Sequence, residues 1–185
     1  MKYYNMKIAG LDRALPLCKV TDDLYIGAFV IFGDPELTTA CAKELLARAP
    51  EFDYMITAEA KGIPLIHEMA RLNGNQRYIL ARKGPKLYMS NIVSVTVHSI
   101  TTAKEQKLYL DGEDAKRMKG KRILIVDDVI STGGSLASLE NLVKQSGGEV
   151  VGKMAILAEG DAITRHDITC LGPLPLFDKN GNPLN

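Results

Sequence analysis

The sequence has little of several features that would place it in a specialised class of protein. Its three cysteines are widely spaced and form no Cys-x-x-Cys pair, so neither a disulfide framework nor a zinc site is indicated. The formal net charge is only +1, which predicts no general attraction to nucleic acid or to a membrane surface. No apolar run approaches the ~20 residues that a membrane helix needs. The first six residues contain no apolar signal-peptide region, and we therefore expect a protein of the reducing cytoplasm.

The remaining composition is that of one globular domain with a sizeable core. The chain has 185 residues, of which 46% are hydrophobic and 24% are charged. No internal repeat, low-complexity segment or interdomain linker divides it. Segments typical of strands alternate with segments typical of helices, which predicts an α/β fold with a mainly parallel sheet covered on both sides. We expect helices at 35–49, 63–72 and 136–144, and strands at 54–57, 78–81, 123–126, 150–157 and 168–171.

One segment departs from this alternation of strands and helices. Val93, Val95 and Val97 alternate with polar residues, which indicates a half-exposed strand, and residues 107–110 return as a second strand. The pair predicts a hairpin inserted at about 86–110. The C-terminal residues 178–185 are polar and are expected to be loose.

The stretch Arg122–Ser135 carries the most chemical information. Ile123–Val126 is continuously apolar, as in a parallel strand that is buried on both faces, and Asp127 and Asp128 follow at its carboxyl end. The loop 131–135 is rich in glycine and hydroxyl groups and opens a helix, so its backbone N–H groups can surround a phosphate. Carboxylates would repel that phosphate and are better suited to hydroxyl groups or a cation. A phosphorylated sugar satisfies both requirements.

These residues resemble the phosphoribosyl pyrophosphate (PRPP) signature of the type I phosphoribosyltransferases. The family pattern is an apolar strand, two acidic residues and a short Thr/Gly-rich loop, all present at residues 123–135. The resemblance implies that Asp127 and Asp128 hold the ribose hydroxyls and act in catalysis. It assigns the 5-phosphate to the loop residues Ser131, Thr132, Gly133, Gly134 and Ser135.

Two further segments resemble purine members of the family. Glu59-Ala60-Lys61-Gly62 is similar to their Glu-Ala-Arg-Gly element, which implies that Ala60 and Lys61 bind the pyrophosphate. Lysine here provides a point charge rather than a bidentate fork. Residues 82–87 resemble the Arg-Lys-Pro-Gly-Lys-Leu segment of adenine enzymes, which implies that the pyrophosphate meets the cations Arg82, Lys83 and Lys86. Without the resemblance, both segments could be turns with solvated cations.

Other positions differ from the adenine enzymes or predict no role. The Glu-Tyr-Gly segment usual before the second hairpin strand corresponds to Thr102–Lys104, which has no acid, and Glu105 is displaced. His98 could transfer a proton, although a solvent-facing histidine is the simpler interpretation. Residues 32–35, Phe-Gly-Asp-Pro, only loosely match a Phe-Arg-Asp-Ile segment near the adenine pocket. The pair His67-Glu68 is expected on an ordinary helix face, and Asp161, Arg165 and His166 are expected to be solvated.

Taken together, we expect a single phosphoribosyltransferase domain over residues 1–185, with a hood formed by about 1–33 and the C-terminal tail. The resemblance implies transfer of the 5-phosphoribosyl group from PRPP to a purine, adenine being favoured. It also implies Mg²⁺, held weakly by Asp127 and Asp128 and mostly through the substrate, and a homodimer. The alternatives are a non-catalytic PRPP or nucleotide sensor and an enzyme for xanthine, guanine, hypoxanthine or orotate. A response-regulator receiver domain is disfavoured, because too few residues follow Asp128.

Overall fold

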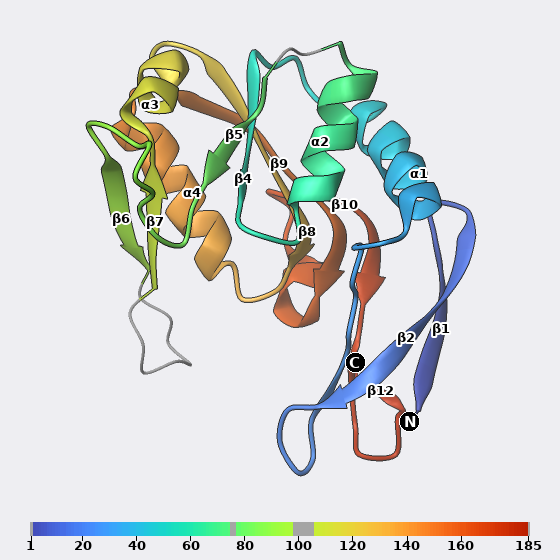
Figure 1. Cartoon of the computed structure of the whole chain (residues 1–185). Coiled ribbons are helices and arrows are strands. Elements are labelled where there is room, and N and C mark those ends of the chain that lie inside the picture. The colour runs from blue at the N-terminus through green and yellow to red at the C-terminus, as the bar shows by residue number, and fades with distance from the viewer. Residues whose placement is uncertain (1, 75–76, 98–105, 185) are drawn as a thin grey trace.

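The computed structural model describes residues 2–74, 77–97 and 106–184 of the chain (Figure 1). They form two five-stranded sheets, a two-stranded hairpin and the helices packed between them. The helices are α1 (Pro35–Leu46), α2 (Ile63–Leu72), α3 (Gly112–Met118), α4 (Gly134–Gln145) and the 3₁₀ helix η1 (Gly160–Thr164). The strands are β1 (Tyr3–Ile8), β2 (Leu11–Lys19), β3 (Tyr25–Gly27), β4 (Tyr54–Ala58), β5 (Ile79–Ala81), β6 (Val93–Val97), β7 (Gln106–Leu110), β8 (Arg122–Ile130), β9 (Glu149–Glu159), β10 (Thr169–Leu174), β11 (Leu176–Phe177) and β12 (Pro183–Leu184).

The central sheet is parallel throughout, which confirms the predicted α/β class. Its strand order is β10-β9-β8-β4-β5, so β8 lies in the middle between β9 and β4. In Figure 1, α1 and α2 lie on one side of this sheet, and α3, α4 and the hairpin lie on the other. The sheet is covered on both faces, and the continuous run Ile123–Val126 of its middle strand is fully buried.

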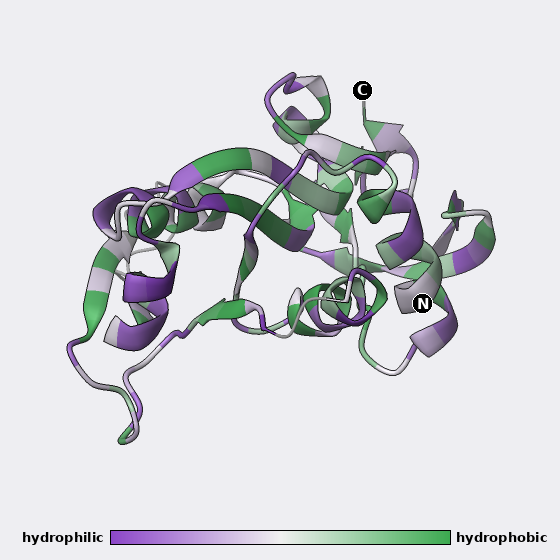
Figure 2. Cartoon of the chain, turned by 90° about the horizontal axis from the view of Figure 1, so that it is seen from above, coloured by the Kyte–Doolittle hydropathy of each residue, from purple (hydrophilic) through white to green (hydrophobic). Residues whose placement is uncertain are grey.

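The alternation of side chains along β8 divides the core into two parts. Ile123 and Ile125 pack with α3, α4 and the hairpin, whereas Leu124 and Val126 pack with α1 and α2. Cys41 of α1 is buried in the second part. Seen from above, the apolar segments gather in the strands between the helical layers (Figure 2).

The second sheet forms the hood and joins the two ends of the chain. Its order is β1-β2-β3-β11-β12, so strands from residues 3–27 pair with strands from residues 176–184. The C-terminal tail is therefore paired rather than loose, and the Asp178 carboxylate accepts hydrogen bonds from the Asn180 and Asn182 backbone N–H groups. Arg13 of β2 fastens the hood to α1 through Nε, which lies 2.7 Å from the Asp34 carboxylate at the α1 N-cap.

The predicted hairpin is confirmed as the antiparallel pair β6–β7. It is anchored next to the end of β5, because the backbones of Arg82 and Tyr109 exchange two hydrogen bonds of 2.8 Å. Leu108 and Val95 point into the core shared with α4. The stretch 98–105, which contains His98, Glu105 and the positions that correspond to the missing Glu-Tyr-Gly segment, lies outside the described residues.

Several element boundaries differ from the prediction. Strand β8 continues through Asp127 and Asp128 to Ile130, because Val129 and Ile130 still pair with β9. Helix α4 begins at Gly134, two residues earlier than expected, and helix α3 was not predicted. No helix within the described ranges is long and apolar enough to cross a membrane.

Candidate active site

A cavity of about 260 Å³ opens near the carboxyl ends of β4 and β8. It brings together six of the residues that the sequence singled out, from segments far apart in the chain. These six are Ala60, Lys61, Lys83, Asp127, Asp128 and Ser135. The other lining residues are Ala58, Glu59, Leu108 and Val129. The remaining predicted residues do not line the cavity: Ser131–Gly134 form the loop that leads to Ser135, and Arg82 and Lys86 belong to the segment around Lys83.

Asp127 and Asp128 are adjacent carboxylates in the last part of β8. The Asp127 carboxylate accepts a hydrogen bond of 2.9 Å from the Asp128 backbone N–H. Asp128 is buried, while Asp127 retains some exposure to solvent. Desolvation raises the pKa of Asp127, and the neighbouring Asp128 carboxylate raises it further, because a second negative charge nearby is unfavourable. A cation or a set of hydroxyl donors in the cavity would relieve this repulsion.

Lys61 supplies the positive charge closest to this pair. Its Nζ lies 2.6 Å from the Asp128 Oδ2 and 3.5 Å from the Phe29 carbonyl oxygen, so it links β8 to the segment that follows the hood strands. The loop that carries Lys61 is tightly packed, since a Cβ at Gly62 would come within 2.3 Å of the Thr57 Oγ1. Only glycine therefore lets the backbone of residues 60–62 lie this close to β4.

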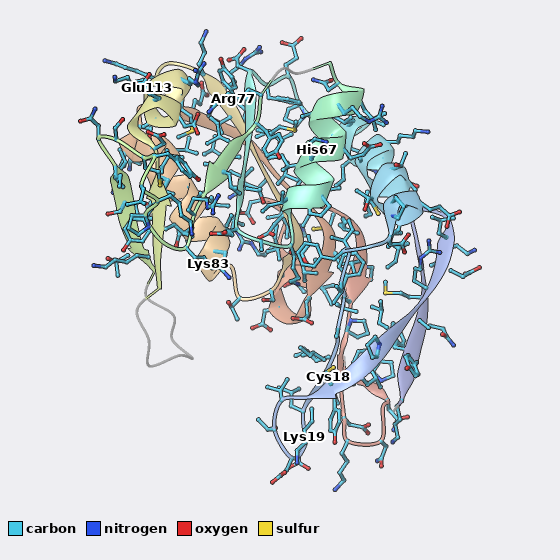
Figure 3. All side chains as sticks on the ribbon, in the orientation of Figure 1. Cys18, Lys19, His67, Arg77, Lys83 and Glu113 are labelled. Atoms are coloured by element: carbon cyan, nitrogen blue, oxygen red, sulfur yellow. The ribbon has the colours of Figure 1, made fainter. Side chains whose placement is uncertain are left out.

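The cation segment is held in place by Glu59 at the end of β4. One Glu59 carboxylate oxygen accepts a hydrogen bond of 3.0 Å from the Lys83 backbone N–H, and the other lies 3.3 Å from the Arg82 guanidinium. These contacts lower the pKa of Glu59. Arg82 also donates to the Tyr88 hydroxyl at 3.2 Å, and it does not line the cavity. Lys83, labelled in Figure 3, is the cation of this segment that reaches the cavity.

The loop between β8 and α4 has the geometry of an anion site. Gly133 is the N-cap of α4 with φ at +82°, a left-handed conformation that favours glycine, and a Cβ at this position would lie 2.7 Å from the Arg165 Nη1. The first N–H groups of a helix have no partner within the helix, and the helix dipole is positive there. Ser135, in the first turn of α4, brings this end of the helix to the cavity.

Three residues near the site were not recognised from the sequence. Leu108 closes the cavity from the hairpin, and no motif in the sequence marks it. Glu159 ends β9; burial raises the pKa of its carboxyl, and the Lys61 ammonium opposes this shift. Arg165 is ion-paired with Asp167 at 2.7 Å rather than solvated, which corrects the expectation for this residue.

The described residues do not hold a metal by themselves, because no group of three or more acidic, histidine or cysteine side chains gathers in them. Two carboxylates beside a ligand cavity do suit a hard cation that keeps most of its bonds to substrate oxygens and water. Asp127 and Asp128 are the residues that would face such a cation.

Comparison with known proteins identifies the family. The family model of the phosphoribosyl transferase domain matches residues 47–173. The hypoxanthine/guanine phosphoribosyltransferase of Methanotorris igneus is 33% identical over 130 residues, which cover 69% of this chain and 67% of that protein. That of Methanococcus voltae is 30% identical and covers 87% of this chain and 89% of its own length. Against one from Methanococcus maripaludis, 34% identical, the chain spans only 56% of the relative's length.

Solved structures of adenine phosphoribosyltransferases share the fold. The enzyme of Thermoanaerobacter pseudethanolicus superimposes with a TM-score of 0.64 at 24% identity, over 77% of this chain and 84% of that one. The enzyme of Rhodothermus marinus superimposes with a TM-score of 0.62 at 21% identity, over 93% of this chain and 94% of that one. At these identities the likeness concerns the fold. The family match over residues 47–173, together with the Methanotorris igneus and Methanococcus voltae relatives, shows that the chain belongs to the purine branch of the type I phosphoribosyltransferases.

Proposed function

We propose that the protein transfers the 5-phosphoribosyl group of PRPP to a ring nitrogen of a purine and releases pyrophosphate. The observation that carries this proposal is the single cavity in which Lys61, Lys83, the two carboxylates of β8 and Ser135 meet. The kinds of group around this cavity match the parts of PRPP: cations for the pyrophosphate, acids for the ribose hydroxyls, and a helix N-terminus for the 5-phosphate.

In this mechanism the protein positions the substrate and balances its charge. The bond between the sugar carbon and the pyrophosphate oxygen breaks, the purine nitrogen forms the new bond on the opposite face, and the base loses one proton. Lys61, Lys83 and the Ala60 backbone stabilise the negative charge that develops on the leaving pyrophosphate. Asp127 and Asp128 orient the ribose hydroxyls, and Leu108 limits the access of water to the reacting carbon.

Mg²⁺ fits this proposal as a cation that arrives with the pyrophosphate. When bound, it would neutralise part of the pyrophosphate charge. Asp127 and Asp128 would hold it mainly through the ribose hydroxyls and water, because the described side chains provide too few ligands for a closed metal site.

For the base, we propose a 6-oxopurine, hypoxanthine or guanine. The relatives of 30–34% identity carry this specificity in their names, whereas the adenine enzymes share the fold at 24% identity or less. The missing Glu-Tyr-Gly segment and the Phe-Gly-Asp-Pro sequence at 32–35 are also departures from the adenine enzymes. Adenine, which the sequence resemblance favoured, stays the competing prediction.

The test is pyrophosphate release from PRPP and Mg²⁺ with adenine, guanine, hypoxanthine, xanthine, orotate and uracil supplied separately. Release with hypoxanthine and guanine is the expected result. Release with adenine alone would refute the proposed base and keep the proposed reaction. PRPP binding without release for any base would instead support a sensor.

A further inference from the structure

Arg165 lies directly against the loop that is proposed to bind the 5-phosphate. A Cβ placed on Gly133 would be only 2.7 Å from the Arg165 Nη1, so the guanidinium occupies the space beside the αL glycine at the start of α4. Arg165 follows η1, in the segment between β9 and β10, and is distant from Gly133 in sequence. The sheet thus brings a fifth cation, besides Lys61 and the three of residues 82–86, to the edge of the site.

The guanidinium is held rigidly by its neighbours. Its Nε and Nη2 donate to the two carboxylate oxygens of Asp167 at 2.9 and 2.7 Å, a bidentate arrangement that fixes the plane of the group. Asp167 in turn accepts from Lys153 at 2.5 Å, and Lys153 lies 2.9 Å from Glu140 of α4. The Arg165 side chain is 31% exposed, so it is ordered against the protein but still open to a ligand.

Two nitrogens of the guanidinium, Nε and Nη2 on one edge, donate to Asp167, and the third nitrogen, Nη1, does not. No residue in the described ranges accepts a hydrogen bond from the Arg165 Nη1, which is the nitrogen that faces Gly133. A guanidinium pinned on one side by a carboxylate presents its remaining N–H groups in a fixed direction, and a phosphate oxygen is the acceptor that it recognises best.

We propose that Arg165 is a further substrate-binding residue that recognises the 5-phosphate of PRPP from outside the Ser131–Ser135 loop. Asp167 is its positioning residue. This inference rests on the proposed function, because it names a contact to the same substrate. It also gives a second reason for glycine at position 133. Besides the left-handed backbone angle, a side chain there would displace the Arg165 guanidinium.

The experiment measures the binding of two fragments of PRPP to the full chain by calorimetry: ribose 5-phosphate, and pyrophosphate with Mg²⁺. The variants are Arg165→Ala and, in case that variant unfolds, Arg165→Gln. The matched control is Arg71→Ala, because Arg71 makes the same two-nitrogen contact with Glu68 at 2.8 Å but lies at the far end of α2. Thermal melting of each variant reports on folding.

The expected result is a Kd for ribose 5-phosphate that rises about 10- to 100-fold in Arg165→Ala, the range of one hydrogen bond between charged groups, with pyrophosphate binding unchanged. Asp167→Asn should raise the Kd for ribose 5-phosphate by a smaller factor than Arg165→Ala does. Unchanged ribose 5-phosphate binding, or equal losses for both fragments, would overturn the inference and leave the proposed function intact. If the wild-type protein binds neither fragment nor PRPP, the proposed function fails, and the inference fails with it.

Discussion

Lys61 and Asp128 are paired across the cavity, with the ammonium nitrogen 2.6 Å from the carboxylate oxygen. One residue comes from the loop proposed to bind pyrophosphate and the other from the strand proposed to bind the ribose hydroxyls. The pair therefore joins the two halves of the site before any substrate is bound. Asp128 is almost fully buried, whereas the Lys61 side chain is 45% exposed. The charged form of Asp128 therefore needs Lys61 as its partner, whereas water can solvate Lys61 without Asp128.

Replacing Lys61 by methionine should consequently impair both binding and folding. We expect kcat/KM for PRPP to fall about 100-fold, because a preorganised charge on the leaving pyrophosphate is lost. The unfolding free energy should fall by about 1 kcal/mol, less than for a fully buried pair, because solvent screens the exposed lysine. Steady-state kinetics and urea unfolding measure the two effects. Lys61→Arg keeps the charge and should retain most of the activity; equal losses in both variants would contradict this role.

Removal of both carboxylates tests the central part of the proposal. The double variant Asp127→Asn with Asp128→Asn should lower turnover about 100-fold or more, because the ribose hydroxyls lose their negatively charged acceptors. The exposed Asp12, on the β1–β2 hairpin of the hood, provides the control: Asp12→Asn should leave turnover unchanged. If the double variant has the same turnover as the wild type, the assignment of the site is wrong.

The sequence predicted those parts of the fold and site that depend on local pattern. The buried strand at 123–126, the start of a helix at residue 35 and the valine alternation of β6 are all local, and each has its predicted structure. The contacts made by Arg165 and Glu59 were missed, because they depend on which sheet neighbours the chain brings together. Similarly, the pairing of the tail with β3 joins residues about 150 positions apart, a separation at which local patterns carry no signal.

The raised pKa of Asp127 gives stability and activity opposite dependences on pH. A carboxyl whose pKa is higher in the folded state than in the unfolded state binds more protons when folded, so its contribution destabilises the fold as pH rises above its ordinary pKa of 3.8 toward the raised pKa. Activity should rise over the same range, because the charged form holds the substrate. The unfolding free energy of Asp127→Asn, measured with urea at several pH values, should decrease less above pH 4 than that of the wild type. An identical decrease would show that Asp127 is not the group responsible.

Gly62 and Thr57 provide a test of the packing beneath the loop that is proposed to bind pyrophosphate. A Cβ at position 62 would overlap the Thr57 Oγ1, so Gly62→Ala should reduce the unfolding free energy by about 1–3 kcal/mol and weaken PRPP binding. The Thr57 hydroxyl has no hydrogen-bond partner among the described residues, so its removal leaves no polar group stranded. Combining Thr57→Ala with Gly62→Ala should therefore restore part of the stability.

The control for Gly62 is Gly84, where an added Cβ meets nothing within 4 Å. Gly84→Ala should leave the unfolding free energy within about 0.5 kcal/mol of the wild type, the usual range for surface changes. If the two alanine variants are equally stable, close packing is not the reason for glycine at position 62.

Glu59 connects the loop that is proposed to bind pyrophosphate to the cation segment, and its charge can be removed with little change of shape. Glu59→Gln keeps an oxygen that can accept from the Lys83 N–H, but the ion pair with Arg82 is lost. We expect KM for PRPP to rise about threefold to tenfold with a smaller change in kcat, because Arg82 and Lys83 become less well ordered before the substrate binds. Glu59→Ala, which removes both contacts, should show a larger effect in the same direction. A fall in kcat with KM unchanged would instead assign Glu59 a direct part in the reaction rather than a positioning role.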